Sequence, residues 1–460
     1  MGDLYDVIIV GGGVAGLISA HKLLKERSNL KLLVIEASDQ VCGVMKTVEL
    51  RSPNGKDYFD IGVSRVGSAQ PIMLGLLKEF GLETYEHFDK GTKHWQLPDG
   101  KVKTYSGSIP PLPYTALVDL LRYFKKMDKL AAQIGKAKST EECAEWDNQT
   151  VEDFMNKFLW MQGAKDMAAT MVGTFCGMAP SKLSMTEYLS VIHSCGSWER
   201  HIGGEGTGRM DLQLKGGFRQ LADRLEESVG KERIVLGDAV VRVEQVEDRT
   251  RATVRTKSGK EYQAKRVVMA IPSPNIEKLE LIPDLPVPRI LATGNYGVHF
   301  IATYQKSFWR EKKQAGELLS MSGTLASFKD NREHPIIALF DTSTPSGSPA
   351  LFGIFGAPSF ATLSMDERKA IALDFMVNIL GKEARDILDY TDVCWSQDEK
   401  GTEPIAAEVR PKPSEVIGTL KDPLGCIHFA GEDTGNVWAG MMECAADSAV
   451  RVVKEVLKAV

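Results

Sequence analysis

Short apolar runs alternate with an amphipathic helical pattern at the start of the chain. Residues 7–10 and 32–35 are β-branched or leucine-rich with no polar position, which is typical of parallel strands buried on both faces. Between them, Val14, Leu17, Ile18 and Leu24 follow the helical period. This order predicts a strand–helix–strand unit of an α/β sheet.

The pattern changes twice along the rest of the chain. Apolar positions at helical spacing dominate residues 115–200 and predict a separate helical layer. A Gly216-Gly217 turn then opens a predicted helix at 218–229, and a further helix is expected at 366–380. Strands are expected at 234–236, 239–244, 252–256, 262–264, 266–271, 296–304, 336–340, 350–355 and 426–430.

The first glycine turn predicts a phosphate-binding loop. Gly11, Gly13 and Gly16 satisfy G-x-G-x-x-G directly after a strand, and the helix that follows begins at Val14 and Ala15. Gly11 permits the tight turn, Gly13 lets a pyrophosphate approach the backbone, and Gly16 lets helix and strand pack closely. The free N–H groups of the helix N-terminus attract phosphate.

An acidic residue stands where such a loop needs one. Glu36, followed by Ala37, ends the second strand 20 residues after Gly16, the spacing at which a carboxylate accepts ribose hydroxyls. Strand, glycines, helix, strand and acid in this order predict a dinucleotide site. These residues alone leave the choice of dinucleotide open.

The C-terminal block repeats the theme of strand, glycine turn and helix. Gly431 and Glu432 follow the strand at 426–430, and Gly440, Met441 and Met442 open a helix. Free amides at this helix start are a second place that favours an electron-rich group.

Because 460 residues exceed a typical single core, we expect two domains. Residues 1–85, 210–280 and 395–460 are predicted to form one nucleotide-binding domain. Residues 86–209 and 281–394 are predicted to form a substrate or cap domain.

Composition excludes several classes of function. The net charge is −5 without a long basic run, so no nucleic-acid footprint is expected. The seven cysteines form no C-x-x-C pair, so we expect reduced thiols and no metal site. Without a signal-peptide pattern or an apolar run long enough for a membrane span, a cytoplasmic protein is expected.

Taken together, these blocks resemble the flavin amine oxidase family, most closely its monoamine oxidases, over nearly the whole chain. Further similar stretches are 60–62, 66–67, 77–85, 308–309, Trp395 and 429–434. The resemblance implies an α/β fold (α+β overall). It comprises a Rossmann-like FAD-binding domain of the two-dinucleotide-binding type and an inserted substrate domain of mixed sheet and helices.

The resemblance also implies the cofactor and the reaction. In such enzymes FAD takes a hydride equivalent from the carbon beside an amine, and oxygen or another acceptor re-oxidises it. Glu36 would hold the adenosine ribose, and Val240 would lie beside the adenine. Glu432 would lie near the ribityl-phosphate part, and Met442 against the pyrimidine end of the ring.

Three departures from the family stand out. Gly43 matches a Gly-Gly-Arg turn near the flavin phosphates, but Val44 occupies the arginine position. His299 falls where many members carry a lysine that holds a water at flavin N5, which makes it the candidate catalytic residue; a hydrogen-bonded core histidine is the alternative. One ring of the family's aromatic pair falls at Met441, and the other near Pro404.

Residues 402–404 (Thr-Glu-Pro) contain no cysteine to link the flavin, so non-covalent FAD is expected. The substrate is expected to be a small apolar or aromatic molecule. Its candidate contacts are Met210, Ile301, Trp395, Trp438 and Met441. The chain length suits a homodimer, although no residue identifies an interface.

Two alternatives to an amine oxidase remain. One is a flavoenzyme of the same fold with non-amine chemistry, an isomerase or desaturase of an apolar substrate. The other is a catalytically weakened FAD-binding protein.

Overall fold

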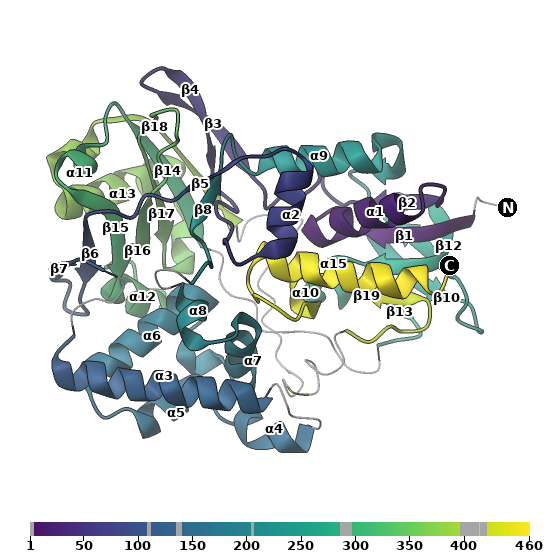
Figure 1. Cartoon of the computed structure of the whole chain (residues 1–460), viewed down its shortest axis with the longest axis horizontal. Helices are drawn as coiled ribbons and strands as arrows, with labels where there is room; N and C mark the ends of the chain where they lie inside the picture. The colour runs from purple at the N-terminus through teal and green to yellow at the C-terminus, as the bar shows by residue number, and fades with distance from the viewer. Residues whose placement is uncertain are drawn as a thin grey trace.

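Two large β-sheets and a layer of helices make up the described part of the computed structural model (Figure 1). The structure describes residues 4–107, 112–134, 140–203, 207–285, 297–395, 414 and 421–460. This mixed α/β arrangement agrees with the fold class predicted from the sequence.

Within the described residues, the first sheet has eight strands in the order β13-β10-β11-β12-β1-β2-β9, with β19 beside β12. The strands β12, β1, β2 and β9 run parallel, as the apolar runs predicted. Their bounds are β1 (Leu4–Val10), β2 (Leu32–Ile35), β9 (Ile234–Val235), β10 (Val240–Gln245), β11 (Ala252–Thr256), β12 (Glu261–Met269), β13 (Glu280–Ile282) and β19 (Ile427–Phe429).

Alternate residues of β1 belong to two hydrophobic clusters. Val7 and Ile9 pack under helices α1 (Val14–Glu26), α2 (Pro71–Glu79), α9 (Arg219–Val229) and α15 (Met442–Leu457). Ile8 and Val10 face the β10–β13 side. Because both faces are covered there, residues 7–10 and 32–35 carry no polar positions, which explains the uninterrupted apolar runs.

One predicted break in this sheet is wrong. The runs at 262–264 and 266–271 form a single strand, β12. The polar residue Lys265 does not interrupt it, because its side chain reaches out to Asp6 (Nζ to Oδ1, 2.7 Å).

The second sheet has the order β18-β14-β17-β16-β15-β6-β7 and is mixed, because β15 pairs with β6 in parallel while its other pairs are antiparallel. Its strands are β6 (Thr92–Gln96), β7 (Val102–Tyr105), β14 (Val298–Tyr304), β15 (Gln314–Ser320), β16 (Ile336–Asp341), β17 (Ala350–Phe355) and β18 (Ile387–Cys394). In β14, Phe300 and Tyr304 pack with residues of α13 (Met365–Leu380), whereas Ile301 packs with the β3–β4 hairpin. The predicted alternation of faces in this strand is therefore correct.

The helical layer predicted for residues 115–200 lies below the second sheet, at the lower left of Figure 1. It consists of α3 (Tyr114–Ile134), α4 (Thr140–Asp147), α5 (Val151–Phe158), α6 (Gln162–Cys176), α7 (Met185–Cys195) and α8 (Trp198–Ile202). The remaining elements are β3 (Thr47–Ser52), β4 (Gly55–Asp60), β5 (Thr84–Glu86), β8 (Leu212–Leu214), α10 (Ser273–Ile276), α11 (Phe308–Glu311) and α12 (Met321–Ser327). The domain boundaries stay a prediction.

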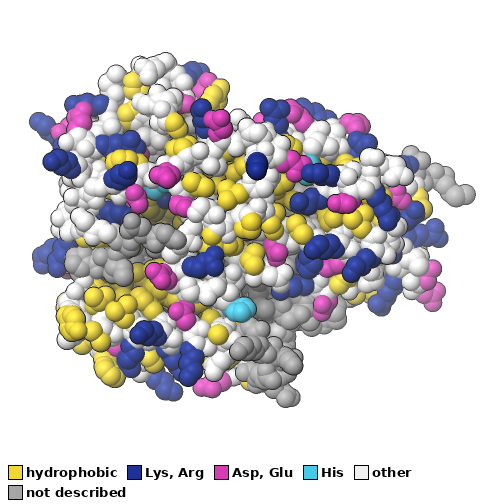
Figure 2. Space-filling view, viewed as in Figure 1, with side chains coloured by type: hydrophobic (Ala, Val, Ile, Leu, Met, Phe, Trp, Pro, Cys, Tyr) yellow, Lys and Arg dark blue, Asp and Glu magenta, His cyan; other side chains and the backbone are white. Residues whose placement is uncertain are grey.

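Basic and acidic side chains are interspersed over the face seen in Figure 2. Hydrophobic side chains gather at the lower left of that view, and Tyr114 and Trp160 are among the exposed apolar residues of the helical layer. No helix in the described ranges has both the length and the apolar character of a membrane span.

The buried side chain of Asp60 connects the β3–β4 hairpin to helix α9. Asp60, at the end of β4, accepts hydrogen bonds from Thr47 Oγ1 (2.5 Å) and from the backbone N–H of Phe218 (2.9 Å) at the start of α9. It thereby caps α9 with a protein side chain. Burial raises the pKa of Asp60 to about 7.

Because the folded protein holds the Asp60 proton more tightly than the unfolded chain does, Asp60 should lower the free energy of unfolding as pH rises from about 4 to about 7. An Asp60→Asn variant keeps the acceptor oxygen but does not titrate. We expect its urea midpoint to change less between pH 5 and pH 8 than that of the wild type. Exposed Glu247→Gln is the matched control and should keep the wild-type pH dependence; equal slopes in Asp60→Asn and wild type would contradict the prediction.

Candidate functional site

The turns near the two ends of the chain lie at one edge of the first sheet. Strands β1, β12 and β19 are parallel neighbours, so their carboxyl ends meet (Figure 1). Gly11, Ala270 and Ala430 follow directly after these strands. The carboxyl edge of a parallel sheet is where α/β proteins bind ligands.

The three motif glycines have different reasons to lack a side chain. Gly11 has φ of +104°, and a Cβ there would lie 2.5 Å from the carbonyl oxygen of Ala270. A Cβ on Gly16 would lie 2.0 Å from the Gly11 oxygen. Gly13 has an ordinary φ of −74° and no atom within 4 Å of its Cβ position. Gly11 and Gly16 are therefore required by packing, whereas Gly13 leaves space at the helix start.

Open space recurs at two further glycines of the predicted site. A Cβ on Gly43 or on Gly440 would also meet no atom within 4 Å. Together with Gly13, they border the predicted dinucleotide site without being forced by protein packing.

Two helices begin near this edge without a side-chain cap among the described residues. The N-cap of α1 is Gly13 and that of α15 is Met441, and neither side chain accepts a helix N–H. Elsewhere the chain supplies carboxylates, since Asp60 caps α9 and Glu443 accepts from the N–H groups of Ile72 (2.9 Å) and Met73 (2.8 Å) in α2. The uncapped amides of α1 and α15 suit anionic or electron-rich groups of a ligand.

Glu36 is fixed between the glycine turn and β2. Its Oε2 accepts from the Gly12 N–H (2.6 Å), and its Oε1 accepts from the Ser38 N–H (2.8 Å). Ala37 lies between Glu36 and Ser38 in the chain. Val240, the first residue of β10, is buried on the same sheet.

Glu432 links the two glycine turns of the C-terminal block. Its carboxylate accepts a hydrogen bond from the Gly440 backbone, while burial and, to a smaller degree, the charge of Asp433 raise its pKa to about 7. Nevertheless the residue retains accessible surface.

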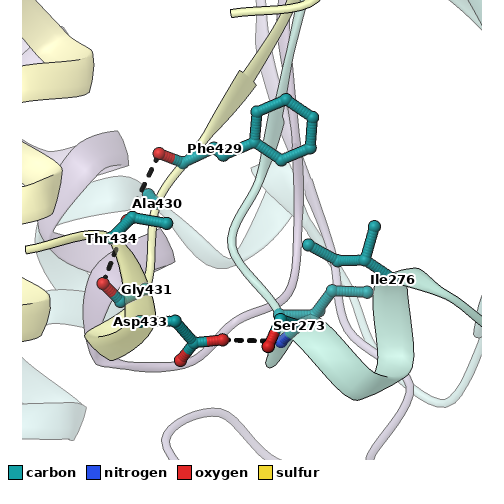
Figure 3. Close-up of a pocket in the computed structure, with 8 residues that line it drawn as sticks. Ser273, Ile276, Phe429, Ala430, Gly431, Asp433 and Thr434 are labelled. Atoms are coloured by element: carbon teal, nitrogen blue, oxygen red, sulfur yellow. Dashed lines mark hydrogen bonds between the residues drawn. The ribbon is translucent and has the colours of Figure 1, made fainter. Parts of the chain in front are cut away.

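A small cavity of about 10 Å³ lies behind this turn, with room for about one water molecule (Figure 3). Asp433 points across it and accepts from the Ser273 N–H at 2.8 Å. Ile276 and Phe429 form part of its apolar wall. This bond fixes the Gly431 turn to the segment that follows β12.

Backbone hydrogen bonds connect the turn at Gly43 to residues 61–63. The carbonyl oxygen of Val44 accepts from the Val63 N–H (2.9 Å), and that of Lys46 accepts from the Ile61 N–H (3.0 Å). The Lys46 side chain is exposed, and 43% of Val44 is accessible.

His299 rests on the same segment. Its Nδ1 lies 3.1 Å from the Ile61 carbonyl oxygen, and because a carbonyl only accepts, Nδ1 carries the proton. The ring is edge-on to Phe352 (centroids 5.2 Å apart) and Trp395 (5.9 Å). Burial lowers the pKa of His299 to about 4, so the imidazole is neutral at pH 7 with Nε2 as an acceptor.

The turn before α15 is anchored on helix α7. Trp438 donates its N–H to the Ser194 carbonyl oxygen, and Ala439 donates to the Ser194 hydroxyl (both 3.0 Å). Trp438 has a φ of +56°, a conformation held only when the surroundings enforce it, and Arg200 stacks 4.5 Å from its ring. Met441 closes the turn by donating to the Trp438 carbonyl oxygen.

The other predicted substrate contacts fall in different surroundings. Met210 lies just before β8 and is half-buried, whereas Ile301 is fully buried between the second sheet and the β3–β4 hairpin. Residues 402–404 lie outside the described residues. No group of three or more His, Cys, Asp or Glu able to hold a metal occurs in the described part of the chain.

Sequence reasoning missed three buried charged residues around the site, Asp60, Glu443 and Arg209. Their sequence neighbours are apolar or glycine (Phe59 and Ile61, Met442 and Cys444, Gly208 and Met210), and periodicity does not show which distant group such a charged residue contacts. Only the hydrogen bonds of Asp60 and Glu443 to distant helix starts reveal their roles.

Comparison with known proteins decides the family. A family model described as flavin containing amine oxidoreductase matches residues 14–457. The chain belongs to this family.

This flavin-containing amine oxidoreductase is an FAD-dependent oxidoreductase with full-length relatives. It is 30% identical to amine oxidase (flavin-containing) A of Equus caballus, an alignment covering 100% of this chain and 86% of the relative. The values for amine oxidase (flavin-containing) B of Homo sapiens are 30%, 100% and 87%.

Solved structures agree in fold. Wild-type putrescine oxidase bound to putrescine superposes on the oxidoreductase with a TM-score of 0.85 at 23% identity, covering 99% of both chains. Cyclohexylamine oxidase from Brevibacterium oxydans IH-35A gives 0.82 at 22% identity, again with 99% of both chains covered.

The contrast between Gly13 and Gly16 is testable. Gly13→Val should leave unfolding of the flavin-free protein within about 0.5 kcal/mol of wild type, because its Cβ meets no protein atom. It should weaken FAD binding at least about tenfold by blocking the loop to the pyrophosphate. Gly16→Ala should instead destabilise by about 1–3 kcal/mol or more through overpacking. Chemical denaturation measures the effect on stability, and FAD titration measures the effect on FAD affinity. Unchanged FAD affinity in Gly13→Val would contradict the prediction that this loop binds FAD.

Proposed function

We propose that the protein binds FAD non-covalently and oxidises a small amine. The observation that carries this proposal is the pair of uncapped helix starts, α1 and α15, at one sheet edge with open space at Gly13, Gly43 and Gly440. A flavin dinucleotide has a pyrophosphate for one helix and an electron-poor ring for the other.

Different residues would contact different parts of FAD. The α1 amides at Gly13, Val14 and Ala15 would receive the pyrophosphate, and Glu36 the adenosine ribose. Glu432, which is partly accessible, would lie near the ribityl chain. Gly16 and Gly11 shape the loop rather than touch the cofactor.

FAD, when bound, accepts a hydride equivalent from the carbon beside the amine nitrogen and passes the electrons to oxygen or another acceptor. The start of α15 at Met442 would stabilise the negative charge that this leaves on the ring, because its N–H groups are fixed in place beforehand.

His299 would position a water or the amine rather than gain or lose a proton. Its Nδ1–H is committed to Ile61, so Nε2 is the atom available to accept a hydrogen bond from a water or from the amine. With a pKa of about 4, it is a weak base and carries no charge at neutral pH. The rings of Phe352 and Trp395 beside it favour a substrate with an apolar or aromatic part.

The cofactor and the reaction are tested together. The purified protein should be yellow, and acid should release FAD, because we expect no covalent link. Anaerobic addition of an amine should bleach the flavin absorption, and air should restore it. Slow restoration by air would favour a dehydrogenase, and turnover without bleaching an isomerase. If a panel of amines leaves the flavin oxidised, the proposed amine oxidation is wrong, whereas the proposed FAD binding still stands.

Replacing His299 tests its role in oxygen chemistry. His299→Lys places a cation where the wild type has a neutral ring, which should attract and stabilise reduced oxygen species. We expect the re-oxidation rate measured by stopped flow to rise, by about tenfold for each 1.4 kcal/mol gained. His299→Gln, which stays neutral, is the control. Equal re-oxidation rates in all three proteins would make His299 a bystander.

A further inference from the structure

Arg209 is a buried arginine with unused hydrogen-bond donors. Only 3% of the residue is exposed, and neither Nε nor Nη1 has a hydrogen-bond partner in the described parts of the chain. The guanidinium lies over the ring of Phe175 in α6, 4.9 Å from its centroid. It therefore has one hydrophobic wall and at least two free N–H groups.

Two other arginines of the described residues are each paired with a carboxylate. Arg310 holds Asp341 through Nε and Nη2, and Arg368 holds Asp392 in the same way, with distances of 2.6–2.8 Å. Burying a cation without such a partner costs several kcal/mol. Arg209 has no such partner among the described residues.

The described groups around Arg209 do not provide an opposite charge. The electrostatic neighbours are the thiols of Cys176 and Cys195, and burial raises the pKa of both, that of Cys176 to about 12. Burial also lowers the pKa of nearby His201 to about 3, so this ring is neutral. Cys176 and Cys195 are the last residues of helices α6 and α7, and the dipoles of these helices offset part of the cost of burying the Arg209 cation. The dipoles do not supply a hydrogen-bond acceptor for the free N–H groups of Arg209.

Arg209 lies against the elements that hold the start of α15. Its carbonyl oxygen accepts from Gln70 Nε2 (2.9 Å), and Gln70 is the N-cap of α2, the helix that Glu443 of α15 caps. On the other side, Cys195 follows Ser194, which binds the turn before α15. Both routes connect Arg209, through Gln70 and through Ser194, to the elements that hold the start of α15.

We propose that Arg209 receives a carboxylate of the substrate, so that the preferred substrates are amines that also carry a carboxylate. This inference rests on the proposed amine oxidation and names its substrate class. A carboxylate supplies the missing negative charge and accepts the free N–H groups in a site screened from water, where a charge-assisted hydrogen bond is strong. The Phe175 ring beside the guanidinium suits an apolar body on the same substrate.

Binding of a non-reacting probe tests this without turnover. Phenylacetate and its neutral analogue phenylacetamide are titrated into the flavin-loaded protein, and binding is followed by the flavin absorption spectrum and by Tm. We expect phenylacetate to bind the wild type at least about tenfold more tightly than phenylacetamide, and Arg209→Met to weaken only phenylacetate, by about 10- to 100-fold. Exposed Arg224→Met is the matched control and should change neither.

Stability gives a second readout. If Arg209 is kept for a ligand, Arg209→Met should raise the Tm of the ligand-free protein, because an unpaired buried charge is removed. A purely structural role predicts a lower Tm and unchanged relative binding of the two probes. Arg209→Lys keeps the charge and should retain part of the preference for phenylacetate, which covers the case in which the methionine variant does not fold.

The outcomes separate this proposal from the proposed function. If amines bleach the flavin but the wild type binds both probes equally, the carboxylate proposal is overturned and amine oxidation stands. If no amine or amino acid bleaches the flavin while phenylacetate binding still depends on Arg209, amine oxidation fails and the carboxylate site stands. Between phenethylamine and phenylalanine, the wild type should reduce its flavin faster with phenylalanine, and Arg209→Met should reverse that order.

Discussion

The site depends on how the chain satisfies the free N–H groups at its helix starts. Four helices begin around the nucleotide-binding region, and two of them, α9 and α2, are capped by the buried carboxylates of Asp60 and Glu443. The other two, α1 and α15, begin with Gly13 and Met441 and no side-chain cap among the described residues. Because buried N–H groups need partners, we propose that these two helix starts bind a ligand.

The capping carboxylates also connect distant segments. Asp60 ties the β3–β4 hairpin to α9, and Glu443 ties the first turn of α15 to α2. Glu443 lies in the first turn of α15, where a carboxylate otherwise favours its own helix start. Its engagement with Ile72 and Met73 leaves the α15 amides available, so the same contact holds the fold and opens the site.

The electrostatics on the substrate side differ from a lysine-based arrangement. His299 is neutral, and its only hydrogen bond among the described residues goes to the Ile61 backbone. Arg209, between α8 and β8, packs on Phe175 of α6 and has no described hydrogen-bond partner for Nε or Nη1. Among these two residues, the positive charge thus belongs to Arg209 rather than to the strand that carries His299, and on this difference we base the proposal of a substrate with a carboxylate.

The sequence by itself determined the parts of the protein that local pattern encodes. Buried parallel strands show as apolar runs, the alternation along β14 shows its two faces, and Gly11, Gly13, Gly16 and Glu36 mark the loop by their spacing. Patterning misjudged the polar position Lys265, because its exposed side chain lies in the middle of a strand and local polarity there resembles a break.

Only the tertiary structure decided which of these residues share surroundings. It separated Gly13, which leaves open space, from Gly16, which packing requires, although both are glycines of one motif. It paired Asp60 and Glu443 with helix starts more than 150 positions away, and it left Arg209 unpaired. Such properties depend on burial and on contacts between distant segments, which short-range periodicity does not record.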